Sequence, residues 1–66
     1  MVDIDKIELL RKQHGYSQDT LALKMGYASK AGYNGKVRGI RQFTIEDVVK
    51  LCNIFQLEPN DLIKWW

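Results

Sequence analysis

Few side chains in this sequence have the type and spacing that catalysis requires. The one histidine, His14, has no serine, cysteine or metal-ligating residue at a recognisable spacing, and the one cysteine, Cys52, falls on an apolar helix face. The glycine-rich stretch GYNGKVRG lacks the Lys-Ser/Thr ending of a phosphate-binding loop. The chain has eight carboxylate side chains, but we expect no pocket that would bring two of them together for general acid–base catalysis. The sequence therefore predicts a protein that is not an enzyme and needs no metal, no cofactor and no small-molecule substrate.

The charged residues instead indicate a polyanionic partner. Residues 20–45 contain no Asp or Glu and five basic residues, so this window carries +5, whereas the remaining five basic and eight acidic residues sum to −3. A basic surface on an otherwise acidic chain is typical of a protein that binds nucleic acid. The alternative is a solvated basic face without a partner. The five basic residues of the window are Lys24, Lys30, Lys36, Arg38 and Arg41.

The length of the chain limits what else it can contain. With 66 residues, 45% of them hydrophobic, there is room for one domain with one modest core. A single cysteine cannot form an internal disulfide, so packing must supply the stability. No apolar run approaches the roughly 18 residues that a membrane span needs. We therefore expect one domain over residues 1–66, in a cytoplasmic protein without membrane contacts.

Polar caps followed by apolar residues at helical spacing predict three short helices in the first half of the chain. The first follows Asp3 and ends near residue 14, and the second follows Ser17 and covers about residues 18–25. The third follows Ser29 and ends near residue 39. Gly32 and Gly35 each cost this third helix about 1 kcal/mol relative to alanine, so tertiary packing must hold it in place.

Two further helices are predicted in the second half. Thr44 and Asp47 resemble a capping box at the start of a fourth helix, whose apolar face includes Ile45. Pro59 suits the first position of a short fifth helix. The predicted fold is thus all-α with five short helices. Its predicted core consists of Ile7, Leu10, Leu21, Ala22, Met25, Tyr33, Val48, Leu51, Cys52, Phe55 and Leu62.

Two stretches resemble the Cro and lambda-repressor type of helix-turn-helix proteins. YSQDTLALKMGY, residues 16–27, resembles the first half of that family's motif, and TIEDVVKLCNIFQLEPNDLI, residues 44–63, is similar to its fourth and fifth helices. Both occur in the family's order and at nearly its spacing. The resemblance implies a compact lambda-repressor-like domain with its helix-turn-helix motif at about residues 17–38, in which the second helix of the motif reads the major groove of double-stranded DNA.

The chain departs from the family pattern between Gly26 and Gly39, where it has one residue more. Placing this residue in the turn, at residues 27–28, gives Tyr33 the buried apolar position of the recognition helix. Val37 and Arg38 then stand where many relatives carry Glu and Asn. Placing the extra residue nearer Val37 instead would shift the base-facing residues by one.

The resemblance also implies roles for individual side chains. Gln18 matches a position that contacts the DNA backbone, and the first turn of the recognition helix points at base edges, where Lys30 suits guanine and Asn34 suits adenine. The alternative for each is a plain surface residue. The expected base-facing residues are Ser29, Lys30, Ala31 and Asn34, and the expected phosphate-binding residues are Gln18, Lys36, Arg38 and Arg41.

Two functions remain open at this point. The first is a sequence-specific transcriptional regulator, a Cro-like or phage-type repressor that binds its operator, in which a homodimer is expected because the family often dimerises through its last helix. The second uses the same fold as a protein-interaction module, an antirepressor or modulator that binds a phage repressor. Trp65 and Trp66 either pack on their own domain or form a partner interface, since aromatic residues are enriched at interface cores.

Overall fold

The computed structural model describes residues 1–64 and contains four α-helices and one short 3₁₀ helix in that range. The helices are α1 (Ile4–Gln13), α2 (Gln18–Lys24), α3 (Lys30–Val37) and α4 (Ile45–Phe55), followed by the 3₁₀ helix η1 (Pro59–Leu62). The predicted all-α fold is confirmed. Trp65 and Trp66, which were expected either to pack on the domain or to form a partner interface, lie outside the described residues.

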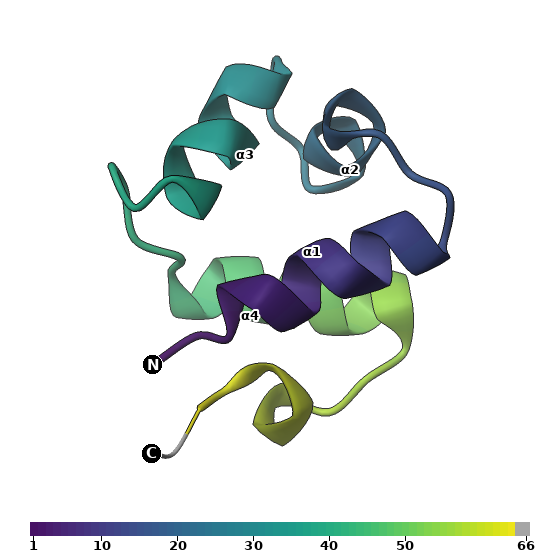
Figure 1. The fold of residues 1–66 in the computed structure, drawn as a ribbon, viewed down its shortest axis with the longest axis vertical. Helices are drawn as coiled ribbons and strands as arrows, with labels where there is room; N and C mark the ends of the chain where they lie inside the picture. Colours follow the sequence, from purple (N-terminus) through teal and green to yellow (C-terminus); the bar gives the residue numbers. More distant parts are fainter. Residues whose placement is uncertain (65–66) are drawn as a thin grey trace.

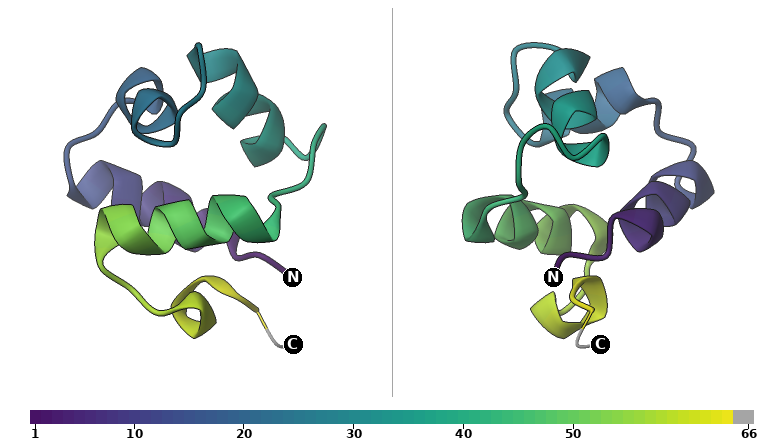
Figure 2. Two further views of the ribbon diagram at one scale, coloured as in Figure 1. Left: turned by 180° about the vertical axis from the view of Figure 1, so that it is seen from behind. Right: turned by 60° about the vertical axis from the view of Figure 1, so that its left-hand side comes forward.

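The helices form three levels. α1 and α4 lie side by side across the middle of the molecule, α2 and α3 lie together above them, and η1 lies below (Figure 1). The same arrangement is seen from behind and from the side (Figure 2). The region predicted to bind DNA, α2 and α3, thus lies at one end of the molecule, and α1 and α4 support it from one side.

Each of the four α-helices starts at the polar cap that the sequence predicts. The side chains of Asp3, Ser17 and Ser29 accept hydrogen bonds from backbone N–H groups of the first turns of α1, α2 and α3, respectively. Thr44 and Asp47 form the full capping box of α4. Capping residues act on backbone groups only three positions away, which is why the sequence alone reveals them.

The core confirms all but one of the predicted residues. Ten of the eleven are buried, among them Tyr33, which has no exposed surface. Leu10 is only half-buried and packs against the edge of the core. Placing the extra residue in the turn, which assigns Tyr33 to the interior, therefore agrees with the structure.

Two expectations about the second half were wrong. Ile45 does not join the apolar face of α4, because it occupies the first helical position, beyond the edge of the core, and is 84% exposed. The fifth helix is a single 3₁₀ turn over residues 59–62, and the Asp61 side chain accepts a hydrogen bond from the Glu58 backbone N–H. Four residues make one such turn, and the chain leaves it at Ile63 in an extended conformation.

The two ends of the described chain pair with each other, which the sequence did not suggest. Val2 forms an antiparallel bridge with Ile63, and the Asp3 backbone N–H donates to the Leu62 carbonyl at 2.8 Å. The Lys64 N–H in turn donates to the Met1 carbonyl at 2.6 Å. These bonds fix η1 beneath α1 at the end of the molecule opposite α3 (Figure 1).

Gly35→Ala is expected to raise the free energy of unfolding by up to about 1 kcal/mol, because alanine is the better helix former. Apart from the two neighbouring residues and the backbone of α3 itself, no atom of the described residues lies within 4 Å of the position that a Cβ at residue 35 would take. Gly32→Ala is the matched comparison and should gain less, because its Cβ would lie 3.3 Å from Cγ of Tyr27. Urea denaturation measures both variants, and a destabilised Gly35→Ala protein would contradict the open space around this residue.

Candidate nucleic-acid interface

The outer face of α3 carries a row of polar and basic side chains. Lys30, Asn34 and Arg38 follow one another at intervals of four residues, so they lie on one side of the helix. Lys30 and Arg38 are exposed and Asn34 is half-buried, whereas the neighbouring Tyr33 is turned toward the core and is buried. Ala31 is exposed beside Lys30. The face of α3 that points away from the core is therefore the one the sequence predicted to read bases.

Ser29 caps this helix, and its cap hydrogen bond restricts what else it can do. Its Oγ accepts from the Ala31 backbone N–H at 3.3 Å. The hydroxyl proton stays available, since accepting a hydrogen bond leaves the O–H donor unused. Ser29 is exposed at the N-terminal end of α3, so it can both start the helix and donate to an acceptor in front of it.

Gln18 and Asn34 are joined in a hydrogen-bonded chain that starts at α1. Asn34 Nδ2 donates to Gln18 Oε1 at 3.1 Å, and Gln18 Nε2 donates to Glu8 Oε1 at 3.2 Å. Three helices thus meet through three side chains. The two amides that were predicted to contact DNA separately form one unit, positioned by a carboxylate behind them.

Glu8 is itself held by two further donors. Arg11 Nε lies 2.6 Å from Glu8 Oε2, and the Tyr33 hydroxyl donates to the same oxygen at 2.8 Å. Burial would raise the pKa of Glu8, but the hydrogen bonds from Arg11, Tyr33 and Gln18 outweigh it and lower this pKa below its usual value. Burial and the bond to Glu8 raise the pKa of Tyr33. Glu8 is therefore an anion and Tyr33 a neutral donor at neutral pH.

The C-terminal half of α3 is tied to α4 by a second carboxylate, Asp47. It forms an ion pair with Lys36 and accepts from the Tyr27 hydroxyl at 2.5 Å. It also accepts from the Thr44 backbone N–H at 2.8 Å as part of the capping box of α4. The Lys36 ammonium lies 5.1 Å from the centre of the Tyr27 ring, which adds a cation–π contact.

The contacts with Asp47 and Tyr27 give Lys36 a role other than the predicted phosphate contact. Its side chain is only 11% exposed and its ammonium pairs with Asp47. Burial would lower the pKa of Lys36, but the bonds with Asp47 and Tyr27 outweigh it and raise this pKa. Lys36 is therefore a charged anchor between α3 and α4, and its ammonium is already engaged by Asp47.

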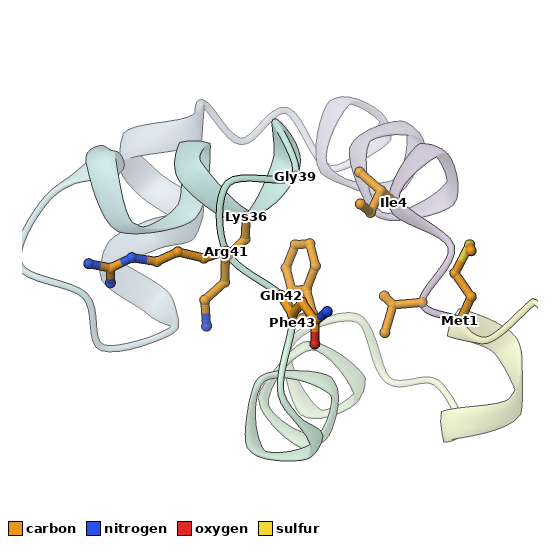
Figure 3. Close-up of a pocket in the computed structure, with 8 residues that line it drawn as sticks. Met1, Ile4, Lys36, Gly39, Arg41, Gln42 and Phe43 are labelled. Atoms are coloured by element: carbon orange, nitrogen blue, oxygen red, sulfur yellow. The ribbon is translucent and has the colours of Figure 1, made fainter.

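Arg41 lies in the loop between α3 and α4, beside a shallow pocket of about 440 Å³. Met1 and Ile4 line one side of this pocket, and the loop from Gly39 to Phe43 lines the other (Figure 3). The guanidinium of Arg41 extends away from Met1 and Ile4 (Figure 3). Arg41 is exposed, so its charge is available to an anion that approaches the C-terminal end of α3.

The sequence matches the family model described as Helix-turn-helix over residues 7–62, which reaches from α1 to η1. The chain belongs to the helix-turn-helix family of the Cro and lambda-repressor type. Members of this family are DNA-binding regulators, so the chain is a DNA-binding helix-turn-helix protein. No curated protein and no solved structure gives a significant match to it.

Within the helix-turn-helix, the turn between α2 and α3 depends on two glycines and a tyrosine. Gly26 has a φ of +89°, a left-handed conformation that ends α2. The Tyr27 ring that follows lies against Gly32, where any larger residue would press on it. The glycine that weakens α3 as an isolated helix thus lets α3 lie close to the Tyr27 ring, and an alanine at this position would require the ring to shift by a few tenths of an ångström.

Sequence reasoning missed the most connected groups of this helix-turn-helix. Glu8, Arg11 and Tyr27 were given no role, and Asp47 was identified only as a capping residue. The spacing of Glu8 and Arg11, three residues apart on one helix, was the one local signal of a pair. The Tyr27 contact with Asp47 joins residues 20 positions apart, and no spacing rule reveals such a contact.

The part of the chain that the structure describes offers no group of three or more His, Cys, Asp or Glu side chains that could hold a metal ion. In the same part, no helix is long and apolar enough to cross a membrane.

The stability of the helix-turn-helix is expected to fall as the pH drops from about 4 to about 2, because Asp47 then takes up a proton. Burial would raise the pKa of Asp47, but hydrogen bonds from Lys36, Thr44 and Tyr27 lower it from 3.8 to about 2. A carboxyl with a lowered pKa stabilises the fold above its unfolded-state pKa, here by on the order of 2 kcal/mol. Asp47→Asn should remove this stabilisation and flatten the pH profile.

Glu46→Gln is the matched control. Glu46 precedes Asp47 on the same helical turn but is exposed, and within residues 1–64 its one ion pair is with Lys50 at 3.6 Å. The free energy of unfolding of Glu46→Gln should therefore depend on pH as that of the wild type does. Chemical denaturation at a series of pH values measures all three proteins, and parallel profiles for Asp47→Asn and wild type would contradict the assignment.

Proposed function

We propose that the protein is a sequence-specific transcriptional regulator that inserts the outer face of α3 into the major groove of its operator. The observation that carries this proposal is the row of Lys30, Asn34 and Arg38 on the one side of α3 that the core leaves free. The absence of any carboxylate from residues 20–45 keeps this surface positive. A helix of this kind fits the groove, whose base edges present acceptors to lysine and a donor–acceptor pair to asparagine.

The remaining contacts follow from the same docking mode. Ser29 and Ala31 lie beside Lys30 at the helix end that meets the bases, where the methyl group of alanine suits thymine. Gln18 keeps one N–H of its amide for a phosphate. Arg38 and Arg41 lie at the other end of α3 and in the following loop, where the DNA backbone passes. Lys36 is not part of this set, because Asp47 holds it.

The resemblance to Cro and phage repressors supports a regulator of the phage or mobile-element type, acting as a homodimer on a two-fold symmetric operator. In this proposal residues 1–66 act as one domain with the helix-turn-helix motif at about residues 17–38. The half-sites would lie about one helical turn, ~34 Å, apart.

Substitutions on the outer face of α3 should separate base contacts from phosphate contacts. Lys30→Ala and Asn34→Ala are each expected to change base preference by about 1–3 kcal/mol at a single position of the site. Arg38→Ala and Arg41→Ala should weaken binding to all sequences alike, and each should reduce the slope of log K against log salt by about 0.9. Site selection from a random duplex pool, followed by fluorescence anisotropy, measures both effects.

Lys12→Ala is the control for these variants, because it removes one exposed positive charge from α1 rather than from the outer face of α3. It should leave base preference unchanged. If all four α3 and loop variants lowered affinity equally on selected and random DNA, the base-reading role of Lys30 and Asn34 would be wrong.

A second candidate function is a modulator that binds another repressor, and the exposed apolar residues of α4 favour it. Ile45 and Val49 lie one turn apart and are 84% and 48% exposed. Such side chains are suited to a protein interface. Under this function the pure protein binds DNA only non-specifically, with Kd on the order of 10⁻⁴–10⁻⁶ M. Nanomolar binding to a selected site by the pure protein would rule it out.

A further inference from the structure

We propose that Glu8, on α1, determines the base that Asn34 reads by fixing the orientation of the Asn34 side-chain amide. Glu8 belongs to the support behind α3, yet the hydrogen bonds through Gln18 connect its carboxylate to the outer face of the helix. It acts as a positioning residue. The inference rests on the proposed function, in which Asn34 faces a base.

The direction of the hydrogen-bonded chain follows from the chemistry of a carboxylate. An ionised carboxylate only accepts hydrogen bonds, so Gln18 must turn its Nε2 toward Glu8 Oε1, at 3.2 Å. The Oε1 of Gln18 then faces α3 and can only accept. Asn34 must therefore present Nδ2 to it, at 3.1 Å. One charge on α1 thus decides the orientation of two amides in succession.

Glu8 stays ionised and in place because other groups hold it. Arg11 donates from Nε to Oε2 at 2.6 Å and from Nη2 to Oε1 at 3.3 Å, and the Tyr33 hydroxyl donates to Oε2 at 2.8 Å. Arg11 is in turn fixed by its Nη1, which donates to the Tyr16 carbonyl at 2.7 Å. The Glu8 carboxylate, at which the chain of hydrogen bonds begins, is therefore held by groups that do not face the DNA.

The orientation of Asn34 controls the pattern it offers to the groove. With one N–H given to Gln18, Asn34 retains its Oδ1 acceptor and a second N–H donor, the pair that matches the N6 amino group and N7 of adenine. The opposite orientation would turn Oδ1 toward Gln18 and leave two N–H donors facing outward. Two donors match the O6 and N7 acceptors of guanine. A carboxylate at residue 8 therefore favours adenine over guanine at the base facing Asn34.

Glu8→Gln removes the constraint that fixes the direction of these hydrogen bonds, because an amide can both donate and accept, and it changes the shape of the side chain little. The new amide can still accept from Tyr33 through its oxygen, while its N–H can donate to Gln18 Oε1. The Gln18 amide is then free to reverse, and Asn34 reverses with it. The variant loses the ion pair with Arg11, so its folding is checked by circular dichroism before any DNA measurement.

The first test compares the affinities for two duplexes that carry adenine or guanine at the position read by Asn34. This position is the one at which Asn34→Ala abolishes the preference between bases. Wild type should prefer adenine there by roughly 5- to 150-fold, the range of a bidentate base contact. Glu8→Gln should reduce this preference to less than about threefold or reverse it, with the other positions of the site unchanged. Fluorescence anisotropy on the two duplexes measures the ratio.

Tyr33→Phe is the matched control, because it removes another hydrogen bond to Glu8 but leaves the carboxylate and the chain through Gln18 in place. It should keep the adenine preference even if stability falls. An undiminished adenine preference in Glu8→Gln, or an equal loss of preference in Tyr33→Phe, would overturn the proposal.

A second test needs no DNA and uses the wild-type protein. NMR scalar couplings across hydrogen bonds should connect the Asn34 Nδ2 to the Gln18 Cδ, which reads the direction of the bond itself. A coupling from the Gln18 Nε2 to the Asn34 Cγ, or no coupling in either direction, would contradict the proposal. Absence of all sequence-specific DNA binding together with the expected coupling would instead reject the proposed function and leave the orientation of the amides established.

Discussion

The position of α3 depends on the buried carboxylate of Asp47. Within residues 1–64 it is the one charged residue that lies fully in the interior, and it has donors on all sides: Lys36 from α3, Tyr27 from the turn and the backbone N–H of Thr44. A buried charge of this kind is tolerated only when its partners are in place. The capping of α4 and the placement of the helix-turn-helix are therefore set by the same atoms.

This constraint explains how a weak helix can present a defined surface. α3 has eight residues, two of them glycine, and would not be stable alone. Tyr33 and Lys36 hold its inner face through Glu8 and Asp47, which stand on α1 and α4. The inner face is thus fixed at two points one turn apart, and the outer face remains free for a ligand.

The caps, the helices and nearly all of the core were predictable because they depend on residues a few positions apart. Thr44 with Asp47 is the clearest case, since both halves of the capping box lie within one turn. The polar network was not predictable, because the Tyr33 hydroxyl reaches Glu8 across 25 positions, and no periodicity marks such a pair. The same limit applies to Lys36, which was predicted to bind phosphate from its charge and its place near the end of the recognition helix, because its partner Asp47 lies on another helix.

If the outer face of α3 is the surface that meets DNA, backbone amide chemical-shift mapping during titration with a short duplex at low salt will show it. We expect the amides of Lys30, Ala31, Asn34 and Arg38 to shift most and added salt to reverse the change. Shifts confined to the exposed face of α4 around Ile45 and Val49, with α3 unaffected, would contradict it.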